Sequence, residues 1–132
     1  MPIFVRFEVP EELAKQTYDV IEKVRDTGKM SKGTNEVTKQ VERGVAKLVV
    51  MAEDTSPEEI LAHVPLLAEE KGITYTYVPS KSELGSSAGL SVGTAAIAVT
   101  DAGSAAELVE DLVKKVNAIH NPGKQEAAAT AE

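Results

Sequence analysis

The sequence predicts an α/β protein: a three-layer α/β/α sandwich with a central mixed sheet of about four strands. Segments with helical spacing alternate with apolar or β-branched runs, a pattern typical of one sheet covered by helices on both faces. The chain has 132 residues, 42% of them hydrophobic, which suits one domain with a substantial core. We therefore expect a single domain over residues 1–120 and a disordered tail over residues 121–132, where the chain becomes polar and Ala-rich.

The first third of the chain predicts two helices joined by a short extended segment. Pro10 and the two glutamates after it favour a helix start, because carboxylates stabilise the positive end of the helix dipole. Gly28 and Gly44 are typical residues at the end of a helix, and Thr34 is a suitable N-cap for the second one. The expected bounds are 10–25 for the first helix, 29–32 for the extended segment and 35–43 for the second helix.

The middle of the chain predicts a buried strand and then a long helix. Residues 47–52 form a nearly continuous apolar run, as expected of a strand covered on both faces. Residues 56–59 combine a capping serine, a proline and a capping-box glutamate, which together favour a helix start. We expect this helix to extend over residues 57–71 and to kink at Pro65, which cannot donate a backbone hydrogen bond.

The last third predicts two further strands, with a short helix and a small-residue loop between them, and a final amphipathic helix. β-branched and aromatic residues favour the first of these strands, and a stripe of leucine and valine favours the helix. The expected bounds are 73–78 and 94–100 for the strands, 82–84 for the short helix, 85–93 for the loop and 105–119 for the final helix.

Composition excludes several classes of protein. No run of 18 apolar residues is present, so no membrane span is expected, and the first residues do not match a secretory signal. The absence of cysteine excludes disulfides and cysteine-based zinc sites. We expect a cytoplasmic protein without a metal or other cofactor.

The charge is unevenly distributed. The net charge is −7, which by itself argues against binding to phosphate backbones. Residues 1–47, however, carry nine basic and eight acidic side chains, whereas residues 48–132 carry five and thirteen. Residues 29–47 carry five basic and only two acidic side chains, which predicts one local basic patch on an acidic body.

The helix expected at residues 35–43 has one apolar and one polar face. At about 100° per residue, Val37 and Val41 lie on one side, and the polar side chains gather on the other. That polar face consists of Asn35, Glu36, Lys39 and Arg43.

The chemistry of this polar face suits nucleic acid. Lys39 and Arg43, with Lys32 upstream, can neutralise phosphates. Asn35 can donate to and accept from base edges, and Glu36 can accept from base amino or imino groups. The first turn of a helix also has free N–H groups, and the glycine before it allows close approach. A helix face of this kind is more often only solvated surface, so the pattern alone leaves both interpretations open.

Five short blocks, taken together, resemble a known family. The first is Gly-Thr-Asn-Glu-Val-Thr-Lys at residues 33–39, and the others follow at residues 42–44, 48–54, 70–73 and 80–85. Their order and spacing resemble the archaeal large-subunit ribosomal protein family that binds kink-turns, and the resemblance extends from about Val9 to Ile119.

The resemblance implies a sharply bent RNA target with tandem sheared G·A pairs beside a short bulge. In the family, the motif Asn and Glu contact the guanines of these pairs, which places Asn35 and Glu36 there, and Lys39 supports both guanine and backbone contacts. Backbone or phosphate contacts are implied for Lys32, Gly33, Thr34, Arg43 and Lys81.

The resemblance also assigns a role to the loop at residues 88–93. In the family an apolar loop at this place packs on a nucleotide flipped out of the bulge, in keeping with RNA recognition through unstacked bases. Leu90, Ser91 and Val92 are the residues implied. The residues by themselves would suggest a plain connection.

Relatives of this kind are shared components of several particles. The resemblance implies ribosomal RNA, box C/D and box H/ACA guide RNA and, in some lineages, RNase P RNA of tRNA processing as ligands. It also implies guide-particle proteins that assemble on the complex. We assume a monomer when the protein is free. This chain is more acidic than expected of the family, and residues 121–132 match none of its motifs.

Two rival interpretations remain at this point. An enzyme is suggested weakly by Glu53-Asp54 after a buried strand, by His63 and His120, and by the glycines at 85, 89 and 93, which match no nucleotide-binding fingerprint. Neither histidine has metal-ligand spacing. An acidic domain that binds only protein is the other rival.

Overall fold

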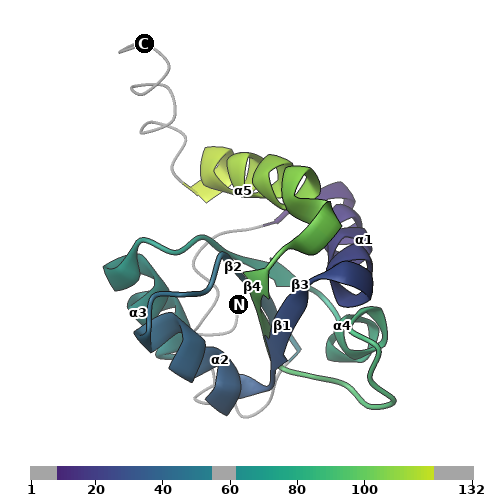
Figure 1. Ribbon diagram of the computed structural model, residues 1–132, viewed down its shortest axis with the longest axis horizontal. Coiled ribbons are helices and arrows are strands. Elements are labelled where there is room, and N and C mark those ends of the chain that lie inside the picture. The colour runs from purple at the N-terminus through teal and green to yellow at the C-terminus, as the bar shows by residue number, and fades with distance from the viewer. Residues whose placement is uncertain (1–8, 55–61, 121–132) are drawn as a thin grey trace.

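The computed structural model describes residues 9–54 and 62–120 (Figure 1). The order of its elements confirms the predicted α/β fold. In chain order they are α1 (Glu11–Thr27), β1 (Lys29–Lys32), α2 (Thr34–Glu42), β2 (Leu48–Ala52), α3 (Val64–Lys71), β3 (Tyr75–Val78), α4 (Lys81–Ser87), β4 (Ala96–Asp101), a 3₁₀ turn (Gly103–Ala105) and α5 (Ala106–His120).

The four strands form one mixed sheet in the order β1-β4-β2-β3. β2 and β3 are parallel, and β4 is antiparallel to both of its neighbours. The carboxyl ends of β1, β2 and β3 therefore meet the amino end of β4 at one edge of the sheet. We call this the C-terminal edge; Lys32, Ala52, Val78 and Ala96 mark it.

Two apolar cores lie on opposite faces of the sheet. All five residues of β2 are buried, and their side chains alternate between the faces, as expected of a pleated strand. Leu48 and Val50 pack with α1, α4 and α5, whereas Val49 and Met51 pack with α2 and α3. Figure 1 shows this division, with α2 and α3 on one side of the sheet and α1, α4 and α5 on the other.

The expected kink at Pro65 is wrong. α3 begins at Val64, so Pro65 lies in its first turn, where the missing amide hydrogen has no helical partner to lose. The expected helix start at residues 56–59 lies outside the described residues, as does the tail at residues 121–132. None of the described helices is long and apolar enough to cross a membrane.

α4 is longer than the expected residues 82–84. Ser80 caps it, because its hydroxyl oxygen accepts a hydrogen bond from the Glu83 amide at 3.2 Å. The helix then continues through Gly85, which was expected to open the loop. The Val92 carbonyl packs where a Cβ atom at Gly85 would lie, so this close approach explains the glycine.

Candidate nucleic-acid interface

The turn from β1 into α2 depends on Gly33. Its φ of 92° lies in a region that glycine adopts and other residues avoid. Its amide donates to the Ala96 carbonyl at 3.0 Å, which extends the pairing of β1 with β4 by one bond. Gly33 is the N-cap of α2, so the expectation that Thr34 fills that position is wrong. Thr34 is the first helical residue, and in the described part of the chain no side chain caps α2.

The two faces of α2 lie as the spacing predicts. Val37 and Val41 are fully buried against the sheet. The predicted polar residues, together with Lys32 before the turn, are all exposed: Lys32, Asn35, Glu36, Lys39 and Arg43. The Lys39 ammonium lies 3.4 Å from a Glu36 carboxylate oxygen, and both side chains are more than half exposed. Such a pair contributes little to stability and can rearrange around a ligand.

Hydrogen bonds to backbone atoms connect the start of α4 to the C-terminal edge of the sheet. Lys81, the first residue of α4, donates its amide hydrogen to the Asp54 carboxylate at 2.8 Å, and its carbonyl accepts from the Thr94 amide at 3.1 Å. The Thr94 hydroxyl donates at 3.2 Å to the Ala96 carbonyl, the same oxygen that accepts from Gly33. Four segments distant in the sequence thus meet at the C-terminal edge. The sequence predictions missed the roles of Asp54 and Thr94, because neither belongs to a motif that signals a backbone contact.

The loop between α4 and β4 returns the chain to this edge (Figure 1). Leu90 is half-buried, and its amide donates to the Gly85 carbonyl at 2.9 Å. Ser91 and Val92 are exposed, and Val92 has 68% of its surface open to solvent. The loop therefore presents exposed apolar surface, and it ends at Thr94, which shares the Ala96 carbonyl with Gly33 at the start of α2.

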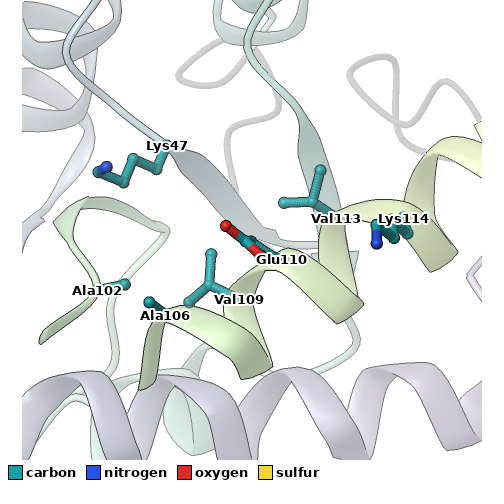
Figure 2. Close-up of a pocket in the computed structure, with 7 residues that line it drawn as sticks. All are labelled: Lys47, Ala102, Ala106, Val109, Glu110, Val113 and Lys114. Atoms are coloured by element: carbon teal, nitrogen blue, oxygen red, sulfur yellow. The ribbon is translucent and has the colours of Figure 1, made fainter. Parts of the chain in front are cut away.

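The expected single basic patch at residues 29–47 is divided between the two ends of the sheet. Lys32 lies at the C-terminal edge, but Lys29 pairs with Asp101 at the opposite edge. Lys47 also lies there, beside a groove of about 400 Å³ that Glu110 and Lys114 share with apolar side chains of α5 (Figure 2). Lys29 and Lys32 lie at opposite ends of β1, so two lysines that are close in the sequence lie at opposite ends of the sheet.

Two of the residues considered for an enzyme, Asp54 and His63, make separate contacts in the described structure. Asp54 holds the start of α4, whereas His63 lies at the start of α3 and contacts Thr38 of α2. Among the described residues there is no group of three acidic, histidine or cysteine side chains that could hold a metal ion. His120 is the last residue of α5, and its side chain lies outside the described part of the structure.

The fold and the C-terminal edge together define a small α/β/α domain in which a helix with a polar, partly basic face begins where a loop with exposed apolar surface ends. The chain belongs to the ribosomal protein L7Ae/L30e/S12e/Gadd45 family, whose signature matches residues 15–109. Among solved structures, it is similar to the 15.5kD RNA binding protein of Giardia lamblia. The two share 33% sequence identity and a TM-score of 0.82, over 90% of this chain and 98% of that one.

Proposed function

We propose that this protein binds RNA and that its specific target is a kink-turn. The observation that carries the proposal is that α2 begins and the loop with Leu90 and Val92 ends at the C-terminal edge, where Gly33 and Thr94 donate to the same carbonyl oxygen. A kink-turn offers two matching features, base edges in the sheared pairs and one unstacked nucleotide. Membership in the family and the likeness to an RNA-binding protein support the proposal.

Each surface has a distinct task in this proposal. Asn35 and Glu36 contact the guanines of the sheared pairs, because an amide and a carboxylate can accept from base N–H groups where a lysine cannot. Lys39 supports these contacts. Leu90, Ser91 and Val92 cover the flipped nucleotide. Phosphate and backbone contacts fall to Lys32, Gly33, Thr34, Arg43 and Lys81.

The acidic body is compatible with this function. Apart from Glu36, Glu42 and Asp54, most of the described acidic residues lie on α1, α3 and α5. At physiological salt, charges farther away than about 8 Å are largely screened. The acidic charge therefore weakens long-range attraction of RNA more than it weakens the contacts themselves.

We propose further that the protein acts as a monomeric assembly factor of archaeal type, in the cytoplasm. Its RNA ligands would be ribosomal RNA, box C/D and H/ACA guide RNA and, in some lineages, RNase P RNA. Guide-particle proteins would then assemble on the complex. Leu66, a large apolar side chain on α3 that is 55% exposed, offers them a contact.

The test is a mobility-shift titration with a short kink-turn RNA in excess tRNA and moderate salt. The control RNA has its sheared G·A pairs replaced by Watson–Crick pairs. Tight binding to the first RNA and little to the second supports the proposal. Equal binding would reduce the site to a general basic surface, and binding to neither would favour the alternative, a scaffold that binds only protein.

A further inference from the structure

A chain of three residues connects α3 to the first turn of α2. His63 is the N-cap residue of α3, and its Nε2 atom lies 3.0 Å from the Thr38 hydroxyl oxygen. The same hydroxyl lies 2.8 Å from the carbonyl oxygen of Thr34, the first residue of α2. In Figure 1 α2 and α3 lie side by side on one face of the sheet.

The direction of these hydrogen bonds follows from the number of available protons. A carbonyl oxygen can only accept, so the single hydroxyl proton of Thr38 must point to Thr34. The Thr38 oxygen then faces His63 with a lone pair, and it can only accept there. His63 must therefore carry a proton on Nε2, which in the neutral ring leaves Nδ1 without one.

Apart from this bond, the described side chains provide no cap for the first turn of α2. In the described residues, Gly33 supplies no capping side chain to α2, and α2 has only nine residues. The ends of short helices fray when their first N–H groups lack side-chain partners. Asn35 and Glu36, which the proposed function places on the guanines, both lie in this turn.

We propose that His63 is a positioning residue for RNA recognition. It fixes the Thr38 hydroxyl on the Thr34 carbonyl, and so holds the first turn of α2 in the geometry that Asn35 and Glu36 need for base contacts. The proposal rests on the proposed function, because only RNA binding gives that turn a specific task. His63 itself acts through Thr38 and needs no contact with RNA.

The binding test compares His63→Ala, His63→Gln and Thr38→Val with Glu70→Ala, a control at an exposed position of α3. Loss of one hydrogen bond predicts that His63→Ala binds the kink-turn RNA roughly five- to tenfold more weakly. Its binding to the Watson–Crick control RNA should not change. Gln has an N–H donor and should restore affinity to within about twofold of the parent.

A double variant tests the path of the effect. His63→Ala combined with Thr38→Val should bind no more weakly than Thr38→Val alone, because the histidine acts through that hydroxyl. Additive losses, or parental affinity in His63→Ala, would overturn the proposal.

A second measurement needs no RNA. The ¹⁵N shifts of the His63 ring in the free protein should show the proton fixed on Nε2, and this preference should be lost in Thr38→Val. A proton on Nδ1 would overturn the hydrogen-bond assignment even if the parent protein binds kink-turns well. Failure of the parent protein to distinguish the two RNAs would instead overturn the proposed function, and with it the role of His63.

Discussion

The amide of Gly33 and the carbonyl of Ala96 are joined by a hydrogen bond of 3.0 Å, although 63 positions separate them in the chain. The same carbonyl accepts from the Thr94 hydroxyl, at the base of the loop that carries Val92. The start of α2 and the end of this loop therefore share one acceptor. Displacement of either segment affects the other, which leads to the first prediction.

Gly33→Ala should destabilise the protein and weaken RNA binding together. Nothing lies within 4 Å of an added Cβ atom, so the cost arises from the φ of 92° and not from a clash. A backbone conformation of this kind costs about 1–3 kcal/mol for a residue other than glycine, and urea unfolding measures it. Ser86→Ala, at an exposed position within α4, is the control. An unchanged unfolding free energy would show that the turn adapts without strain.

Asn35→Ala and Glu36→Ala should each weaken kink-turn binding without changing stability. A good contact to a base edge contributes about 1–3 kcal/mol of discrimination, which corresponds to roughly five- to 150-fold in the dissociation constant. Both side chains are exposed, so the urea midpoint should stay within error. Glu42→Ala, at the other end of α2, is the matched control. If all three variants bind alike, the guanine contacts lie elsewhere.

Lys39→Ala should weaken binding to every RNA and reduce its dependence on salt. Each phosphate neutralised by a lysine releases a counterion, so the slope of log affinity against log salt should become shallower by about 1. Titrations between 50 and 200 mM salt, about the range over which such slopes are resolved, measure it. Lys15→Ala, an exposed lysine on α1, should leave the slope unchanged, and a change as large as that of Lys39→Ala would point to a general charge effect.

Leu90→Asp should weaken binding only to RNA whose bulged nucleotide carries a base. Contact with one unstacked base contributes about 1–3 kcal/mol, and a carboxylate removes it and adds repulsion. The difference between parent and variant should shrink when the bulged nucleotide is abasic. Leu108→Asp, at a partly exposed leucine on α5, controls for the added charge. An equal loss with the abasic RNA would place Leu90 outside the nucleotide contact.

Tyr18→Phe should change the response of stability to alkaline pH. The Tyr18 hydroxyl accepts from the Ser80 amide at 3.1 Å and lies 3.4 Å from the Ser80 carbonyl, which joins α1 to the start of α4. Burial above all raises the pKa of Tyr18; the Ser80 contact lowers it, and the nearby Glu83 raises it again.

Because the folded pKa lies above the unfolded value of about 10, the contribution of Tyr18 is complete below pH 10. It is lost as the pH rises through the folded pKa. The phenylalanine variant should therefore lose about 1 kcal/mol near neutral pH and show a shallower decline above pH 10. Parallel curves for the two proteins in urea unfolding would contradict this.

The sequence predicts the fold well where periodicity is strong. The buried run of β2 and the stripe of α5 locate these elements within one or two residues, because packing and local preference agree there. Two strands, β3 and β4, begin two residues later than expected, and the larger errors lie at helix ends. Pro65 was placed inside a helix that begins only one residue before it, and Gly85 was placed in a loop although it is helical. Pro65 is accommodated because the first turn of a helix needs no amide hydrogen there, and Gly85 is required by the close approach of the distant Val92 carbonyl.

The candidate site could be predicted only in part. Spacing within α2 separates the buried valines from the exposed Asn35 and Glu36, because both lie on one helix. The joining of the loop's end at Thr94 to the start of α2 depends on β4 being antiparallel to β1, which no local pattern specifies. The roles of Asp54 and His63 depend on single hydrogen bonds to distant residues, and they become visible only in three dimensions.

The shortness of β1 has a consequence for crowded surroundings. This strand is one of the two outermost strands of the sheet. It has four residues and carries an exposed lysine at each end. An open edge strand invites addition of a strand from another molecule, and lysines oppose this because pairing would crowd their ammonium groups. Copies of the protein at high local concentration can therefore remain separate, without their sheets fusing into aggregates.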